Sequence, residues 1–199
     1  MIKIGLTGGI ASGKSTVSKM LMELSIPVVD ADVASRKVVE PGQPALIEII
    51  DVFGSGVIQA DGTLDRKKLG AVIFGDEDKR KMLNAIVHPR VREWMQVQIK
   101  GCEEMGENAI VLDIPLLIES QLKSWADKVL LVYVPKAIQI ERLMTRDQIS
   151  EEEALLRIHS QMPLDEKKAY ADRVIDNQGS LQDTREQLLT ILGEWGIGN

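Results

Sequence analysis

A glycine-rich segment between an apolar run and a helical pattern most constrains the fold of this 199-residue chain. Residues 8–16 read GGIASGKST and fit the pattern G-x-x-x-x-G-K-S/T. The residues before it alternate as in a strand, and the apolar residues after it recur at helical spacing, at Val17, Met20, Leu21 and Leu24. A strand, a glycine-rich turn and a helix in this order predict a loop that binds the phosphates of a nucleoside triphosphate.

The residue types in this segment suit phosphate binding. Gly8 and Gly13 can adopt backbone angles that other residues avoid, so successive amides can turn toward an anion. Lys14 can place its charge on the β- and γ-phosphates of ATP, and the Ser15 hydroxyl can bind Mg²⁺. The other loop residues expected to contact the nucleotide are Gly9, Ala11, Ser12 and Thr16. The alternative is an ordinary glycine-rich turn from a strand into a helix.

Five short apolar segments alternate with helical patterns along the chain, at residues 2–6, 27–30, 109–113, 129–134 and 173–176. This order predicts an α/β fold of the P-loop NTPase type, with a five-stranded parallel sheet flanked by helices. We expect one domain, whose core comprises residues 1–32, 105–136 and 171–199. We expect a helical insertion at about 33–104 to bind a second substrate, the acceptor. We expect residues 137–170 to form a small helical lid.

Charge and composition restrict the partners of the chain. The net charge of −6 argues against nucleic acid as a main partner. Residues 33–100 hold 11 lysines and arginines against nine aspartates and glutamates, a local charge of +2 that suits an anionic second substrate. The alternative is a solvent-exposed helix surface of mixed charge. No apolar run reaches the roughly 20 residues of a membrane span, and no obligate protein partner is indicated. A lone Cys102, on an apolar stripe with Met95 and Ile99, fits a reducing, cytoplasmic location.

Carboxylates follow two of the predicted strands. Asp30 and Asp32 end the second strand, and Asp113 ends the third. Phosphoryl transfer to a hydroxyl needs a carboxylate that orients the alcohol or accepts its proton, and Asp32 is our candidate. Asp113 has the position of an acid that binds Mg²⁺ directly or through water. The alternatives are that Asp30 or Asp32 caps a helix, and that Asp113 forms a turn with the nearby Pro115.

Two arginines stand four residues apart in the predicted lid. Arg142 and Arg146 lie on one face of a helix expected from residue 138 to residue 147, where they can converge on phosphates. The alternative is a solvent-facing helix that pairs with Glu141 and Asp147. Residues 150–153 read SEEE, which predicts a capping box at the start of the next helix.

His88 and Pro89 are adjacent in the predicted insertion. Proline is favoured at the first position of a helix, so we expect a helix to begin at Pro89. A lone histidine is more often packed than functional, and His88 on these grounds has no assigned role. No group of histidines and cysteines suggests a structural metal.

The chain resembles the dephospho-CoA kinase family nearly from end to end. The matching segments are residues 5–15, 30–32, 39–42, 61–66, 88–89, 115–119, 142, 146–147 and 171–179. The phosphate loop is shared with many other NTPases, whereas the Asp-Ala-Asp, Pro-Leu-Leu and Val-Ile-Asp-Asn segments in this order are specific to the family. Ala11 stands where glycine is frequent.

The resemblance implies that ATP, with Mg²⁺, phosphorylates dephospho-coenzyme A to give coenzyme A and ADP. It implies that Asp32 acts on the ribose 3′-hydroxyl and that Lys14 and Arg142 hold the transferring phosphoryl group. Arg146 and Asn177 would contact ATP. The residues implied to bind the acceptor, besides Asp32, are Arg36, Arg66, His88, Pro115 and Leu116.

Two other classes of protein share parts of this pattern. A nucleoside monophosphate kinase or another small-metabolite kinase would have the same core, acceptor insertion and arginine lid. A regulatory GTPase would also have the phosphate loop, but its Asn-Lys-x-Asp guanine signature is absent from the chain. Turnover of AMP or shikimate, or a preference for GTP without any acceptor, would favour one of these readings.

Overall fold

The computed structural model describes residues 1–198 and divides the chain into two compact units. The first unit comprises Met1–Val29 and the residues from Cys102 onward, and the second comprises Asp30–Gly101. The second unit spans nearly the same residues as the insertion predicted at 33–104. Its role in binding an acceptor stays a prediction.

The first unit contains the five-stranded parallel sheet that the sequence predicts. The strands are β1 (Ile2–Gly8), β2 (Val28–Asp30), β3 (Ala109–Asp113), β4 (Lys128–Tyr133) and β5 (Arg173–Asp176), in the order β2-β3-β1-β4-β5. β1 is central, with Leu6 opposite Asp113 of β3 and Gly8 opposite Val132 of β4. Because all the strands are parallel, their carboxyl ends lie at one edge of the sheet, where α/β proteins bind ligands.

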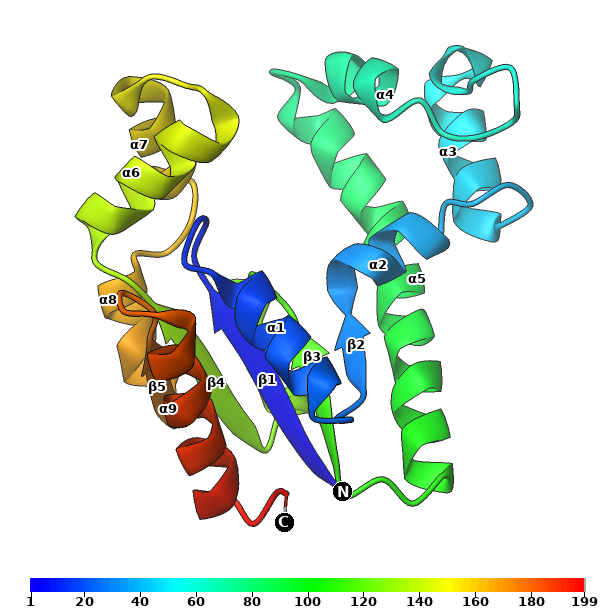
Figure 1. Ribbon diagram of the computed structural model, residues 1–199. Coiled ribbons are helices and arrows are strands. Elements are labelled where there is room, and N and C mark those ends of the chain that lie inside the picture. The colour runs from blue at the N-terminus through cyan, green and yellow to red at the C-terminus, as the bar shows by residue number, and fades with distance from the viewer. Residues whose placement is uncertain (199) are drawn as a thin grey trace. The chain divides into compact units, whose positions relative to one another are not determined.

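One face of the sheet is covered by α1 (Lys14–Glu23) and α9 (Leu181–Glu194), which lie in front of the strands in Figure 1. The predicted stripe on α1 is confirmed, because Val17, Met20 and Leu21 are buried against β1, β3 and β4. α9 adds three buried side chains, Leu188, Ile191 and Leu192. A capping box at Ser180 and Asp183 fixes its first turn.

The predicted lid is helical. It contains α6 (Lys136–Asp147), α7 (Glu151–His159), α8 (Leu164–Lys167) and the 3₁₀ turn η3 (Lys168–Tyr170). The capping box predicted before α7 is confirmed, because Ser150 and Glu153 exchange both side-chain-to-backbone hydrogen bonds. Leu143, Ala154 and Ile158 form the small core between α6 and α7. Another 3₁₀ turn, η2 (Leu122–Trp125), precedes β4.

The second unit is built from helices, as the sequence indicates. It contains α2 (Ala31–Lys37), α3 (Pro44–Phe53), the turn η1 (Ser55–Val57) and α4 (Arg66–Ile73). The long helix α5 (Glu77–Glu104) begins in this unit and continues into the first. Buried apolar side chains from these elements form the core of the unit: Val38, Val39, Ala45, Ile49, Val57, Leu69 and Ile86.

The expectation that a helix begins at Pro89 is wrong. Pro89 lies inside α5, a helix of 28 residues. A proline removes one helical hydrogen bond, here to the carbonyl of Ala85, and usually costs about 3 kcal/mol. Ala85 and Pro89 are exposed, so water can reach that carbonyl, while Ile86 and Met95 on either side of the proline are buried. Tertiary packing therefore carries the helix through a residue that the local pattern marks as a start.

Two further expectations concern the burial of Cys102 and the absence of a membrane-spanning segment. Met95, Ile99 and Cys102 are buried, so Cys102 is a packing residue as predicted. Burial raises the pKa of the Cys102 thiol, and the charge of Glu107 adds to this. Among residues 1–198, no helix is both long enough and apolar enough to cross a membrane.

Candidate active site

The predicted phosphate loop lies between the end of β1 at Gly8 and the start of α1 at Lys14. Gly13 precedes the first residue of α1 with a φ of 88°, and Ala11 adopts a φ of 59°. The Ser12 amide donates to the Gly9 carbonyl over 3.1 Å, which closes the turn. Glycine adopts a positive φ without steric cost, which suits Gly13. Ala11 adopts a positive φ although it has a side chain.

The loop is packed too tightly for side chains at its three glycines, and a Cβ atom on Gly9 would lie 2.8 Å from Gln139 Nε2. A Cβ atom on Gly8 would lie 2.5 Å from Ser12 Oγ, and one on Gly13 would lie 2.0 Å from Asn177 Nδ2. Ser12 is fully buried, and its hydroxyl has no hydrogen-bond partner within residues 1–198. An unsatisfied buried hydroxyl is uncommon in proteins, and here it lies in the loop expected to bind phosphate.

Three side-chain amides anchor the backbone of the loop. Gln139 Nε2 of α6 donates to the Ile10 carbonyl over 2.8 Å, and the Ile10 amide donates to Gln161 Oε1 over 3.0 Å. Asn177 Nδ2, directly after β5, donates to the Ser12 carbonyl over 2.9 Å. Sequence reasoning missed the two glutamines. The only signal was a polar residue, Gln139, at a core-facing position of a helix, where it is buried.

Asn177 is thus an internal support of the loop. It is buried, and Thr184 Oγ1 donates to its Oδ1 over 2.8 Å, so both ends of its amide are engaged. The expected contact of Asn177 with ATP stays a prediction.

Lys14 and Asp113 are brought together at the carboxyl edge of the sheet. Lys14 Nζ forms an ion pair with Asp113 Oδ1, and the Asp113 side chain is almost completely buried. Asp113 ends β3, and the loop that carries Lys14 follows the neighbouring strand β1. Because β1 and β3 are parallel neighbours, Lys14 and Asp113 lie together at the carboxyl edge of the sheet. This is the position expected for an acid beside the phosphate loop.

The turn after Asp113 holds Pro115 and Leu116, which the resemblance assigns to the acceptor. The Pro115 carbonyl accepts a hydrogen bond from Thr7 Oγ1 over 2.9 Å, so its backbone is tied to β1. Leu116 is exposed. The acceptor contacts expected of Pro115 and Leu116 stay predictions. The nucleotide contacts expected of Ser15 and Thr16 also stay predictions.

The two lid arginines have different environments. Arg142 Nη2 donates to the Asn177 carbonyl over 2.9 Å, beside the loop. Arg146 instead pairs with Asp147 over 2.7 Å, and Arg157 binds the same carboxylate over 2.7 Å. The hydrogen bond from Arg146 lowers the pKa of Asp147, and the positive charges of Arg146 and Arg157 act in the same direction. For Arg146, this is the surface pairing with Asp147 that the sequence left open as an alternative.

Asp30 and Asp32 lie in the second unit and have separate roles there. The Asp30 carboxylate caps α2, accepting from the Asp32 amide over 2.7 Å and from the Val33 amide over 3.1 Å. Asp32 lies in the first turn of α2, and its side chain is exposed. The capping alternative is therefore correct for Asp30, whereas the carboxylate of Asp32 is not needed to cap the helix.

The other acceptor residues expected from the resemblance also lie in the second unit. Arg36 on α2, Arg66 at the start of α4 and His88 on α5 are all exposed. None of them lines the cavity of about 440 Å³ that this unit contains between α5 and the segment from α2 to α3.

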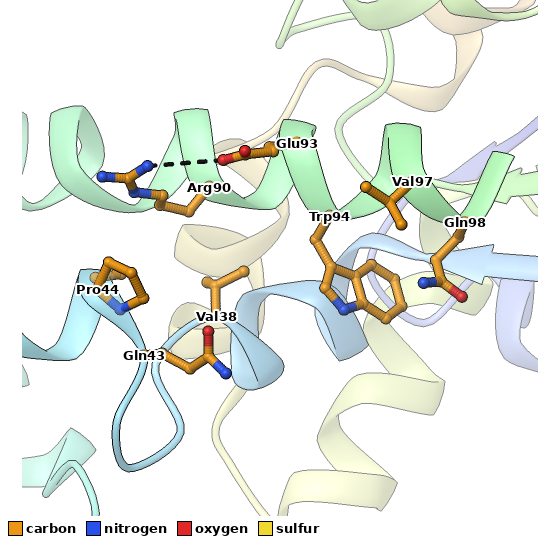
Figure 2. Close-up of a pocket in the computed structure, with 9 residues that line it drawn as sticks. Val38, Gln43, Pro44, Arg90, Glu93, Trp94, Val97 and Gln98 are labelled. Atoms are coloured by element: carbon orange, nitrogen blue, oxygen red, sulfur yellow. Dashed lines mark ion pairs between the residues drawn. The ribbon is translucent and has the colours of Figure 1, made fainter. Parts of the chain in front are cut away.

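Figure 2 shows the cavity, with Trp94 of α5 projecting toward the segment that carries Val38 and Pro44. Arg90 and Glu93 form an ion pair of 3.6 Å at one end. Two glutamines complete the polar lining, Gln43 and Gln98. Five apolar and four polar residues line the cavity, and its volume lies within the range of small-molecule sites. Sequence reasoning did not single out these residues.

The described residues contain no group of three or more histidine, cysteine, aspartate or glutamate side chains that could hold a metal ion by itself. Ser15 and Asp113 offer oxygen ligands near the phosphate loop. Mg²⁺ in kinases is usually held by one or two such oxygens together with phosphates of the substrate. The donor set therefore fits an ion that binds together with the nucleotide.

A parallel sheet in the order β2-β3-β1-β4-β5, a glycine-rich loop with its lysine and a neighbouring buried acid define a P-loop kinase. The family model described as dephospho-CoA kinase matches residues 2–183. The chain therefore belongs to the dephospho-CoA kinase family, whose members transfer a phosphoryl group from ATP to dephospho-CoA in the final step of coenzyme A biosynthesis.

Relatives and solved structures agree with this assignment. A dephospho-CoA kinase of Bacillus cereus is 58% identical over 98% of this chain and 98% of its own length. The structure of TT1252 from Thermus thermophilus is 36% identical with a TM-score of 0.81, and covers 97% of each chain. Dephospho-CoA kinase from Campylobacter jejuni is 28% identical with a TM-score of 0.69, and covers 96% of each chain.

Proposed function

We propose roles for the described residues in the transfer of a phosphoryl group from ATP to the ribose 3′-hydroxyl of dephospho-coenzyme A. The ion pair of Lys14 and Asp113 carries the proposal, because it joins the loop lysine to a buried acid at the carboxyl edge of the sheet. Lys14 contacts the β- and γ-phosphates and stabilises the charge that develops as the γ-phosphoryl group leaves. When ATP binds, Lys14 moves from its acidic partner to the phosphates.

The remaining groups of the loop bind and orient the triphosphate. The amides of Ile10, Ser12 and Thr16 bond within the protein, so the amides of Gly9, Gly13 and Lys14 are the ones assigned to the phosphate oxygens, and the buried Ser12 hydroxyl supplies another donor. Mg²⁺ would be held by the Ser15 hydroxyl and by Asp113, directly or through water, and would neutralise charge on the β- and γ-phosphates. Arg142, on the lid, contacts the transferring phosphoryl group. Arg146 contacts ATP.

Asp32 serves the acceptor. Its exposed carboxylate orients the 3′-hydroxyl for attack and accepts its proton late in the transfer. Asp30 supports it by capping the first turn of α2, on which Asp32 lies. Arg36, Arg66 and His88 contribute positive charge or hydrogen-bond donors to the anionic acceptor, in agreement with the local charge of this segment.

The cavity beside Trp94 suits the neutral arm of the same acceptor. Dephospho-coenzyme A carries a flexible arm with two amide groups, and the cavity offers apolar contacts with the amides of Gln43 and Gln98. Val97→Lys at its lining should raise the KM for dephospho-coenzyme A and leave ATP affinity unchanged. An unchanged KM would remove the cavity from the acceptor site.

The decisive test of the mechanism is Asp32→Asn, assayed by ADP release with dephospho-coenzyme A as acceptor. Loss of a general base typically costs about 10²–10⁴-fold, and kcat should fall by that factor. Asp30→Ser is the matched control, because serine is also a good helix cap and should leave kcat nearly unchanged. If folded Asp32→Asn retained more than about a third of wild-type kcat, Asp32 would not be catalytic and the assignment would move to Asp113.

A cytoplasmic location accords with this activity, with the single buried Cys102 and with ATP as a substrate. Fractionation of cells that produce the protein would check it, with the protein expected beside cytoplasmic marker enzymes.

A further inference from the structure

Lys167, a residue outside the site described above, is fully buried at the end of α8. Its ammonium pairs with Glu119 Oε1 over 2.8 Å. It also donates to two backbone carbonyls, those of Gly8 over 3.4 Å and of Pro115 over 3.3 Å. All four residues belong to the first unit. The ammonium thus joins the phosphate loop, the turn after β3 and α8 of the predicted lid.

Stability alone is a weak reason for such an arrangement. Burial of a charge is costly, and a buried ion pair is often no more stabilising than well-packed apolar residues of the same volume. Glu119 Oε1 also accepts from the Met162 amide over 3.2 Å, while Glu119 Oε2 is buried without a hydrogen-bond partner among the described residues. Because burying Lys167 and Glu119 costs desolvation energy, we looked to function for a role of this pair.

The two carbonyls that accept from Lys167 lie close in sequence to the groups proposed to act on phosphate, the Gly9 amide and Asp113. In a trans peptide the carbonyl and the following amide point in opposite directions. A fixed Gly8 carbonyl therefore fixes the direction of the Gly9 amide, the first amide of the loop. Pro115 follows Asp113 by two residues, so its held carbonyl restrains the backbone next to the acid that pairs with Lys14.

We propose that Lys167, held in place by Glu119, is a positioning residue that aims the Gly9 amide at the phosphates of ATP and restrains the turn after Asp113. The inference rests on the proposed role of the phosphate loop. Glu119 neutralises the buried charge, so the pair acts through geometry and adds little net potential at the phosphates.

The test separates positioning from folding with single and double variants. Lys167→Met leaves Glu119 buried without its partner and should lower both stability and activity. Lys167→Met combined with Glu119→Gln removes both charges and keeps an acceptor for the Met162 amide, so resistance to urea should return close to the wild-type level. If Lys167 positions the loop, kcat/KM for ATP in this double variant should stay at least about tenfold below wild type.

Lys168→Met is the matched control, because the neighbouring Lys168 forms an ion pair with Asp165 at the surface. It should leave kcat and KM unchanged. Recovery of both stability and kcat/KM in the double variant, to within about twofold of wild type, would overturn the proposal. If the double variant does not fold, Lys167→Arg decides the question. It keeps the charge but changes the donor geometry, and wild-type kcat/KM for ATP in a folded Lys167→Arg protein would equally overturn the proposal.

Lys14→Ala in the same series distinguishes this inference from the proposed function. Full activity of Lys14→Ala would refute the phosphate-loop assignment itself. An inactive Lys14→Ala protein alongside a fully active double variant would refute only the role of Lys167. The amide resonance of Gly9 gives a second readout, because its change on binding ADP should be smaller in the double variant than in Lys168→Met.

Discussion

Gly13→Ala should destabilise the first unit more than alanine at another glycine of the same unit with a similar positive φ. Gly13 has a φ of 88°, and an alanine in this region costs about 1–2 kcal/mol. Its added Cβ would also lie 2.0 Å from Asn177 Nδ2. Asn177 cannot move aside freely, because Thr184 Oγ1 donates to its Oδ1 and Arg142 Nη2 donates to its carbonyl.

The additional cost follows from the hydrogen bond that the methyl group would break. Asn177 Nδ2 donates to the Ser12 carbonyl over 2.9 Å in a buried position. Loss of one such bond, with its groups left unpaired, costs about 1–3 kcal/mol. Gly106 supplies the control, because its φ is 77° and no atom lies within 4 Å of an added Cβ. Gly13→Ala should therefore lower the free energy of unfolding by about 1–3 kcal/mol more than Gly106→Ala.

Urea unfolding followed by far-ultraviolet circular dichroism and by tryptophan fluorescence would measure this difference. The change in chain entropy of the unfolded state is the same for both substitutions and cancels in the comparison. ATP affinity, measured by calorimetry, should fall in Gly13→Ala alone. Equal losses of stability in the two variants, to within about 0.5 kcal/mol, would show that the loop does not pack against Asn177 as described.

Three further perturbations test the site. Lys14→Ala should nearly abolish ADP release while the protein stays folded, and unimpaired turnover would contradict the assignment. Arg142→Ala should lower kcat more than it raises the KM for ATP, whereas Arg146→Ala should mainly weaken ATP binding, and normal kinetics in both would leave the pair as surface residues. Because Arg146 lowers the pKa of Asp147, the stabilisation from this pair is complete above the usual carboxyl pKa and is lost as pH falls through the lowered value. Arg146→Ala should raise the pKa of Asp147, and a carboxyl titration by NMR that shows no change would refute the assigned cause.

The local elements of the fold could be predicted because their signals lie within a few residues of one another. The strand before the loop, the stripe on α1 and the capping box at Ser150 and Glu153 each depend on neighbours in sequence. The path of α5 through Pro89 could not be predicted, since it depends on burial of Ile86 and Met95 by residues from other segments. Proline at that position carries the same local signal whether a helix begins there or continues.

Parts of the site were beyond sequence reasoning for the same reason. Asp30 and Asp32 are two residues apart and chemically identical. Only the extended backbone of Asp30, with φ −94° and ψ 121°, shows which of them caps α2. The sequence predicts Lys14 and Asp113 at one edge because parallel strands end together. The supports of the loop, in contrast, are a glutamine on α6 and an asparagine 165 positions from the serine it contacts.

The chemistry of those supports is consistent with a loop that binds a highly charged ligand. Gln139, Gln161 and Asn177 together satisfy two carbonyls and one amide of the loop, which requires both donors and acceptors. A carboxylate at any of these positions would repel the triphosphate, and a free ammonium would compete with Lys14 for it. Neutral amides fix the backbone without adding net charge, and the buried ammonium of Lys167 is matched by Glu119. The charged side chains at the loop are therefore those assigned to the nucleotide and its ion, Lys14, Asp113 and Arg142, while the backbone amides contribute their dipoles.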